Sequence, residues 1–366
     1  MKRRVVAKLS ALAWLGAFAA IASGCAHLLL DDCPEGGVLG KDTVRLRTSH
    51  YRIEIASRPI AARRFAPYAL MATYAYHDDP GCNADEKDNR IDTDRAESLA
   101  KDIAAASGWT RIREMGTSKG CEDARTGFLY HVWQRSVNGR TEIAIVFRGT
   151  SGWRDWLYGN AWWLTRFFND HDQISQAREE AGKVIAEFKA REKAAGRERP
   201  RFVSTGHSLG GGLAQHTVYA YPNDVDQAIA FDSSSVTGSA AVDEERQREA
   251  CSCRDSLAPE ARMMRVYESY EVLSNLRIFH KVFLPPERHV QEVRFPYDHS
   301  WNPVAAHSML ALAQSLQADA ARVNDADKDK HWYASKDSSC TPKVVAAQKA
   351  SCSAPRREGL FGVCPR

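Results

Sequence analysis

The stretch RFVSTGHSLGGGLAQHTVYA, residues 201–220, constrains the fold of this chain more than any other segment. Its alternating start, RFVSTG, predicts a short strand, and LGGGLAQHTVYAY predicts a helix, so the backbone reverses within the motif GHSLG at 206–210. A reversal this sharp leaves no room for side chains two residues before and two residues after Ser208, which explains the glycine at both places. The pattern predicts a strained turn that exposes the serine hydroxyl at a helix N-terminus, where negative charge is stabilised. The alternative is a glycine-rich turn without chemistry.

The segments around this turn alternate between strand and helix patterns. Asn138-Gly139 lies between two β-rich runs and predicts a hairpin. Strands that alternate with helices indicate an α/β fold with a mostly parallel sheet flanked by helices, and with the hairpin at its start. The expected helices are 64–77, 173–191, 209–221 and 305–317, and the expected strands are 128–137, 141–147, 201–206, 226–231 and 261–269.

The first 24 residues have the composition of an export signal. A basic head precedes the apolar run ALAWLGAFAAIASG, which is too short to span a bilayer. The run ends in ASGC at 22–25, which resembles the box of bacterial lipoproteins, where signal peptidase cuts before the cysteine and the thiol is acylated. Lipidation of Cys25 would anchor the protein to the bacterial cell envelope, on the periplasmic side of a membrane. Ordinary secretion, with cleavage near Ala26, is the alternative.

Four parts of the chain differ in composition. We expect a signal peptide at 1–24, an N-terminal tether or extension at 25–60, the α/β domain at 61–323 and a charged, cysteine-containing appendage at 324–366. Without the signal, the number of Lys and Arg residues equals the 46 Asp and Glu residues, so the chain has no excess of positive charge for binding nucleic acid.

Cysteine usage supports an oxidising compartment and argues against a metal. Apart from Cys25, eight cysteines remain among the nine, an even number that permits four disulfides without giving their pairing. A zinc site is the competing interpretation, but the sequence has no C-x-x-C pair, and Cys251 and Cys253 are one residue too close. We therefore predict no metal and no organic cofactor.

A serine hydroxyl is a poor nucleophile at neutral pH and needs a histidine base held by a carboxylate. When G-x-S-x-G lies between a strand and a helix, the chain order is serine, acid, histidine. Both partners of Ser208 should therefore follow it in the sequence.

Four motifs carry a resemblance to a known family. They are IVFRGT at 145–150, GHSLGG at 206–211, RVYESYEVLSNL at 265–276 and AAHSML at 305–310, of which the first two are specific and the last two looser. With them, residues 65–320 resemble the class 3 lipases, a fungal-lipase-like family of α/β-hydrolases. The resemblance implies an α/β-hydrolase fold with a nucleophile elbow at Gly206–Gly210.

The resemblance also implies an oxyanion hole and the two partners of Ser208. Thr150, after F-R-G, and the amide of Leu209 take the oxyanion places, where each donor contributes about 3 to 4 kcal/mol. Glu271 takes the place of the family's aspartate, with Glu268 as the alternative acid. The family's histidine precedes or opens the closing helix, which here is His307, at the start of SMLALAQSL. His299 is the alternative base.

The segment 153–168 is far richer in aromatic residues than the 9% of the whole chain. It follows F-R-G-T, where class 3 lipases carry an amphipathic lid, so we expect a lid or an acyl-site lining. A buried packing cluster is the alternative. The residues concerned are Trp153, Trp156, Trp162 and Trp163.

These features predict a serine carboxylic-ester hydrolase of the lipase or phospholipase A type. It would cleave acyl esters of lipids through a Ser208-His307-Glu271 triad and an acyl-enzyme, beside a membrane that it reaches through lipidated Cys25 and the lid. Short-chain esterases and acyltransferases share this chemistry. A different class is a non-catalytic envelope lipoprotein that uses a hydrolase scaffold for binding, which the glutamate at 271 and the cysteine-rich tail favour.

Overall fold

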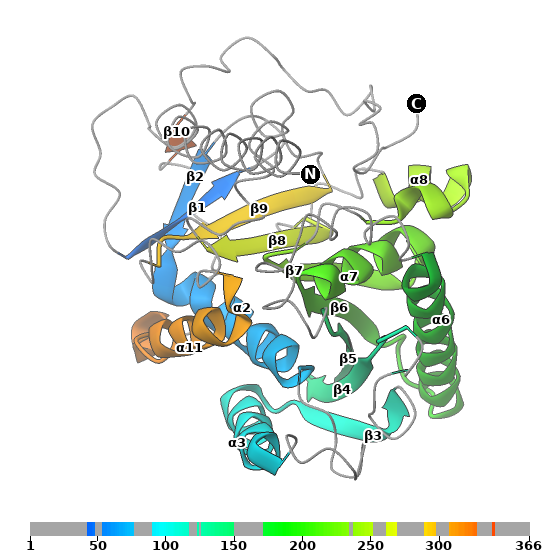
Figure 1. Ribbon diagram of the computed structural model, residues 1–366, viewed down its shortest axis with the longest axis horizontal. Coiled ribbons are helices and arrows are strands. Elements are labelled where there is room, and N and C mark those ends of the chain that lie inside the picture. The colour runs from blue at the N-terminus through cyan, green and yellow to red at the C-terminus, as the bar shows by residue number, and fades with distance from the viewer. Residues whose placement is uncertain are drawn as a thin grey trace, which may run out of the picture.

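One mixed sheet organises the protein. The computed structural model describes residues 42–47, 53–76, 90–116, 123, 126–149, 171–233, 237–251, 261–268, 289–297, 307–327 and 339–340. Within these ranges ten strands lie in the order β10-β2-β1-β9-β8-β7-β6-β5-β4-β3 (Figure 1). The strands are β1 (Thr43–Arg47), β2 (Ile53–Ser57), β3 (Thr110–Gly116), β4 (Tyr130–Val137), β5 (Arg140–Phe147), β6 (Arg201–His207), β7 (Val225–Phe231), β8 (Met263–Glu268), β9 (Val290–Phe295) and β10 (Ser339–Cys340).

The centre of the sheet is parallel and both of its flanks are antiparallel. Strands β5, β6, β7, β8 and β9 run in one direction. Strands β4 and β3 continue the sheet antiparallel on one side, and β1, β2 and β10 do so on the other. The predicted α/β class and parallel core are confirmed, whereas the second antiparallel flank was not expected.

The predicted hairpin joins β4 to β5. Val137 pairs with Arg140, and the two residues between them, Asn138 and Gly139, have φ angles of 50° and 77°. A two-residue turn with positive φ at both positions matches the twist of the flanking strands, and Asn-Gly adopts it most readily.

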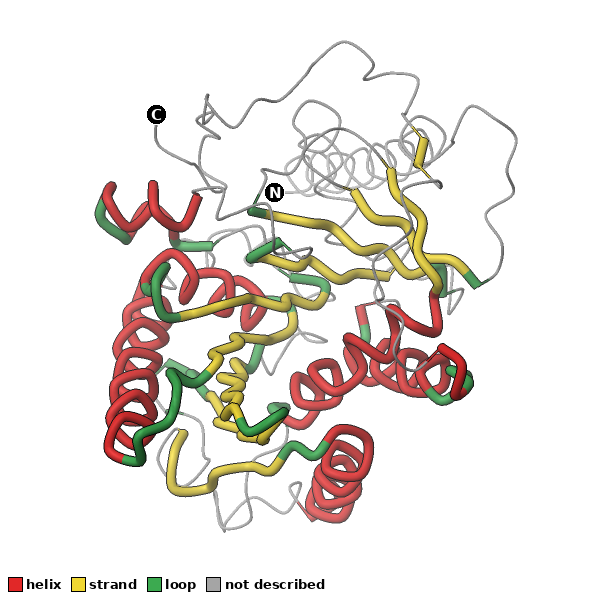
Figure 2. The backbone as a smooth tube through the Cα atoms, turned by 180° about the vertical axis from the view of Figure 1, so that it is seen from behind, coloured by secondary structure: helices red, strands yellow, loops and turns green. Residues whose placement is uncertain are grey.

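Two hydrophobic cores cover the two faces of the sheet, because side chains alternate along each strand. On β5, Ala144 and Val146 belong to the core under α2, α3 and α11, while Ile143, Ile145 and Phe147 belong to the core under α6 and α7. Figures 1 and 2 show these helices on opposite sides of the sheet. The helices are α2 (Arg58–Tyr74), α3 (Arg90–Ser107), α6 (His171–Ala194), α7 (Leu209–Ala220), α8 (Glu244–Cys251) and α11 (Met309–Ala320), with short 3-10 turns η2 (Ser239–Ala241) and η4 (Asp325–Asp327).

The sheet extends beyond the domain expected at 61–323. Strands β1 and β2, from the segment expected to be a tether, pair with each other and β1 pairs with β9. Strand β10, from the expected appendage, pairs with β2. The sheet therefore includes strands from before residue 61, and Val44, Leu46 and Ala56 of these strands are buried in the same core as α2.

Several predictions concern residues outside the described ranges. The signal segment, Cys25 and most of the other cysteines lie there, so lipidation and disulfide pairing stay predictions. In the part of the chain that is described, no helix combines the length and the hydropathy needed to cross a bilayer.

A buried ion-pair cluster ties three strands together and predicts a pH dependence of stability. Glu142 on β5 accepts from Arg135 on β4 at 2.6 Å and from Arg201 on β6 at 2.8 Å, and its side chain is 7% exposed. Burial alone would raise the pKa of Glu142, but the two guanidinium groups outweigh it and hold the pKa below its usual value. A lowered folded-state pKa stabilises the protein above the unfolded pKa, and the benefit is lost as pH falls through the folded one.

We expect Glu142→Gln to lower the free energy of unfolding at pH 7 by about 2 to 3 kcal/mol, because two partly buried cations lose the buried carboxylate that pairs with them. Urea unfolding of the parent protein and of Glu142→Gln, at pH 7 and near pH 3, measures the difference in their free energies of unfolding. This difference should shrink at low pH. An equal difference at both pH values would contradict the lowered pKa of Glu142.

Candidate active site

The carboxyl ends of the parallel strands meet at one edge of the sheet, where ligands of open α/β sheets bind. Residues that follow or end three neighbouring strands, β6, β7 and β8, meet at this edge. They are Ser208 after β6, Asp232 after β7 and Glu268 at the end of β8. His307, which lies in the chain just before α11, is beside them.

Ser208 lies in a strained turn between β6 and α7. Its φ of 56° and ψ of −121° are uncommon for a residue with a side chain, and its amide donates to the Phe231 carbonyl at 3.0 Å. The amides of Gly211 and Gly212 donate to the Ser208 carbonyl, so the turn leads directly into the helix. The amide of Leu209 belongs to the first helical turn, whose N–H groups have no partner within the helix.

The glycines on either side of Ser208 are required by space. A Cβ on Gly206 would lie 2.5 Å from the backbone of Gly210 and 2.6 Å from the Phe147 carbonyl oxygen. A Cβ on Gly210 would lie 2.3 Å from that same oxygen and 2.7 Å from the backbone of Arg148. Gly206 thus makes room for Gly210, and both glycines make room for the end of β5 and the residue after it, in line with the steric reason predicted from the sequence.

Asp232 is held by the backbone on both of its sides. It is 1% exposed and has a φ of 37°. Its amide donates to the Val266 carbonyl at 2.9 Å, and its Oδ1 accepts from the Glu268 amide at 3.2 Å. These bonds to β8 fix the direction of the carboxylate.

His307 lies two residues before α11 and is 2% exposed. The helix begins after Ser308, whose Oγ accepts from the Ala311 amide at 3.4 Å as an N-cap. Helix α11 packs against α2, and the Thr73 hydroxyl of α2 donates to the Met309 carbonyl at 3.4 Å. This histidine therefore lies just before a packed helix, which begins at Met309 and not at the expected residue 305, and its role as the base stays a prediction.

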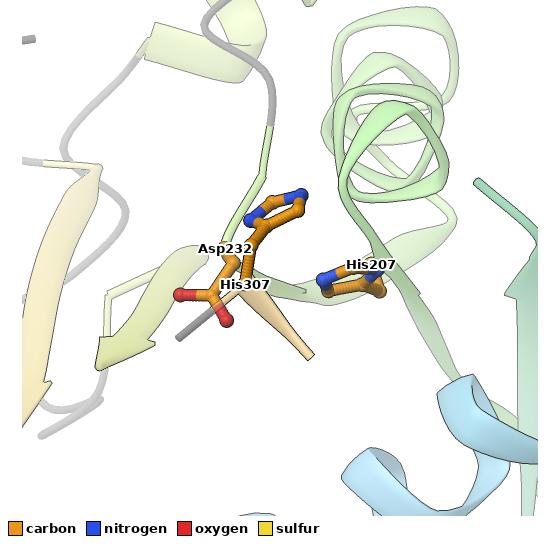
Figure 3. A group of neighbouring side chains, drawn as sticks. All are labelled: His207, Asp232 and His307. Atoms are coloured by element: carbon orange, nitrogen blue, oxygen red, sulfur yellow. The ribbon is translucent and has the colours of Figure 1, made fainter. Parts of the chain in front are cut away.

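Three buried polar groups meet at this edge. A ring nitrogen of His207, a ring nitrogen of His307 and a carboxylate oxygen of Asp232 all lie within 4.8 Å of one another. The two imidazole rings are 4.6 Å apart between centroids and inclined at 41°. Figure 3 shows the three side chains arriving from separate elements around one small space. Since His207 directly precedes Ser208, the serine belongs to the same neighbourhood.

Among solved structures, distant matches to this chain are lipases. These include lipase II from Rhizopus niveus, which is 14% identical over 58% of this chain and 73% of that chain, with a TM-score of 0.33. M37 lipase is 12% identical over 74% of this chain and 83% of that chain, also with a TM-score of 0.33. No family model and no curated protein matches the sequence. The likeness is distant, so the function proposed below rests on the side chains themselves.

Asp232 is the acidic group that the sequence interpretation missed. It directly follows the predicted strand DQAIAF and lies between Ser208 and His307 in the chain, which are the two signals that could have identified it. Instead, residues from 232 onward looked like a polar loop. Glu268, the alternative acid, is 1% exposed at the end of β8, and its amide holds Asp232.

The other predicted site residues lie outside the described residues. They are Glu271, Thr150, Trp153, Trp156, Trp162, Trp163 and the alternative base His299. Their roles therefore stay predictions.

Two histidines and an aspartate are also a donor set that suits zinc. However, Nδ1 of His207 is 2.7 Å from the Tyr76 hydroxyl, so that nitrogen already has a partner. His207 could therefore offer a metal only its Nε2, whereas a histidine and carboxylate pair next to Ser208 needs no nitrogen of His207.

Proposed function

We propose that this protein is a serine carboxylic-ester hydrolase that cleaves acyl esters of lipids. The observation that carries the proposal is the meeting of His307 and Asp232 beside a strained, glycine-flanked Ser208 at the N-terminus of α7. This is the combination of nucleophile, base and orienting carboxylate that acyl transfer requires. The chain order of serine, acid and histidine agrees with it.

The reaction follows from the roles of these groups. Ser208 Oγ attacks the ester carbonyl while His307 takes the hydroxyl proton, and Asp232 stabilises the imidazolium that forms. The amide of Leu209, with Thr150 as its expected partner, would stabilise the oxyanion of the tetrahedral intermediate. The intermediate expels the alcohol, which receives the proton from His307. Water, activated by the same histidine, then releases the acid from the acyl-enzyme.

A lipid is the substrate class that the remaining predictions support. Lipidation of Cys25 would hold the enzyme beside a membrane, and an aromatic lid would open where apolar surface is no longer penalised by water. Hydrolysis rates on p-nitrophenyl esters of increasing acyl length, on a triacylglycerol and on a phospholipid would separate esterase, lipase and phospholipase activity.

A fluorophosphonate probe tests the proposal directly, because it reacts only with an activated serine. We expect covalent labelling of the folded protein on the peptide that contains Ser208, with labelling abolished by heat denaturation. If folded protein takes up no label at this peptide, the protein is better described as a non-catalytic envelope lipoprotein built on a hydrolase scaffold.

A further inference from the structure

His207 has contacts that the triad does not explain. Its Nδ1 lies 2.7 Å from the hydroxyl of Tyr76, the last described residue after α2. Its ring lies against the ring of His307, and its side chain is buried. His207 therefore connects the end of α2 with His307, the histidine that precedes α11; Figure 3 shows the two histidines.

The proton positions in this contact follow from the neighbouring groups. Removal of the phenol from water raises the pKa of Tyr76, so the hydroxyl keeps its proton. The amide of Gly149 faces the phenol oxygen as a donor, which leaves the hydroxyl hydrogen for Nδ1 of His207. Burial, and then the neighbouring His307, lowers the pKa of His207 well below its usual value. A neutral imidazole that accepts at Nδ1 carries its proton on Nε2.

The second ring nitrogen of His207, Nε2, is buried and has no hydrogen bond of good geometry among the described residues. The backbone of His307 also lies near the His207 ring, where it acts against the lowering of the His207 pKa. One side of His207 is thus fixed by Tyr76, while the other side meets both the ring and the backbone of the proposed base.

We propose that His207 is a positioning residue, held by Tyr76, that sets the place of the His307 imidazole for proton transfer. The role rests on the proposed function, because it concerns the base of that reaction. A neutral ring is suited to it: it can stay in contact when His307 becomes an imidazolium, whereas a second cation would repel it. Placement matters, since a shift of about 1 Å in a reacting group costs about 100-fold in rate.

Three variants test this role through kcat. His207→Phe keeps a ring and removes both nitrogens, His207→Gln keeps an N–H donor near the place of Nε2, and Tyr76→Phe removes only the hydroxyl. We expect kcat on a soluble ester to fall about 10- to 100-fold in His207→Phe with KM changed less than about twofold. His207→Gln should recover part of the loss. The double variant of Tyr76→Phe and His207→Phe should cost no more than His207→Phe alone.

His216 provides the matched control. It is a buried histidine on α7 whose Nδ1 is 3.2 Å from the Thr237 carbonyl, in the core on the opposite face of the sheet from α2. We expect His216→Gln to lower the midpoint of thermal unfolding but to leave kcat of the folded protein unchanged. If the three site variants keep the kcat of the parent, or lose it only in proportion to stability as the control does, the positioning role is wrong.

The tautomer of His207 can be read without any turnover. In two-bond proton–nitrogen spectra of protein labelled at its histidines, the signal lost in His207→Gln should show a neutral ring protonated at Nε2, and Tyr76→Phe should change it. A proton on Nδ1 in the parent protein would overturn the role. Absence of ester hydrolysis in the parent, with the expected tautomer, would instead count against the proposed function.

Discussion

Replacing Ser208 with alanine should lower kcat for ester hydrolysis by about 10⁴-fold or more, because the proposed acyl-enzyme forms on the Ser208 hydroxyl. The change should leave the fold intact, since the strain of the turn comes from the backbone and alanine has no larger Cβ than serine. Substrate should still bind, because oxyanion donors and acyl contacts remain. The measurement is initial rate against substrate concentration, together with fluorophosphonate labelling of the same preparation.

Ser204→Ala is the matched control for this change. Ser204 is a buried serine on β6, the strand that leads to Ser208, and its hydroxyl donates to the Ala214 carbonyl at 2.7 Å. Loss of the Ser204 hydroxyl should lower the free energy of unfolding by about 1 kcal/mol and leave the activity unchanged. If folded Ser208→Ala hydrolysed esters as fast as the parent protein, the proposed serine mechanism would be ruled out.

Asp232→Asn should lower kcat by about 10³- to 10⁴-fold, close to the effect of removing the nucleophile's base. An amide has nearly the size of the carboxylate and can still accept from the Glu268 amide, so the geometry should survive. The Asp232→Asn variant loses the negative charge that stabilises the imidazolium and selects the tautomer of His307.

Glu271→Gln is the parallel variant, because the family resemblance assigns the acid to this residue whereas the described geometry brings Asp232 to His307. We expect Glu271→Gln to retain most of the activity. The reverse pattern, an active Asp232→Asn and an inactive Glu271→Gln, would transfer the acid to Glu271 and leave Asp232 as a support of the turn. Equal losses in both would mean that two carboxylates share the role.

Local patterns predicted the centre of the fold well. The turn at Ser208 and the hairpin at Asn138 depend on neighbouring residues, through glycine clearance and positive φ angles, and both can be recognised in the sequence. The start of α11 beside His307 likewise follows from an apolar helical period.

What the sequence could not predict depends on contacts between distant segments. Strand β1 is too short to be recognised alone and becomes a strand because it pairs with β9 and β2. Asp232 looks like an ordinary loop residue until the Glu268 amide and His307 are placed beside it. Tyr76, similarly, belongs to the site only because α2 ends next to His207.

The position of His307 late in the chain has a consequence for protein synthesis. Ser208 and Asp232 leave the ribosome long before His307, and the edge of the sheet is completed only when β1 can pair with β9 at Arg45 and Arg294. Pairing between such distant segments is slow to form and requires most of the chain. A nascent or truncated product that stops short of residue 307 would therefore carry the proposed nucleophile without the proposed base, and under the proposed function it could not yet hydrolyse esters.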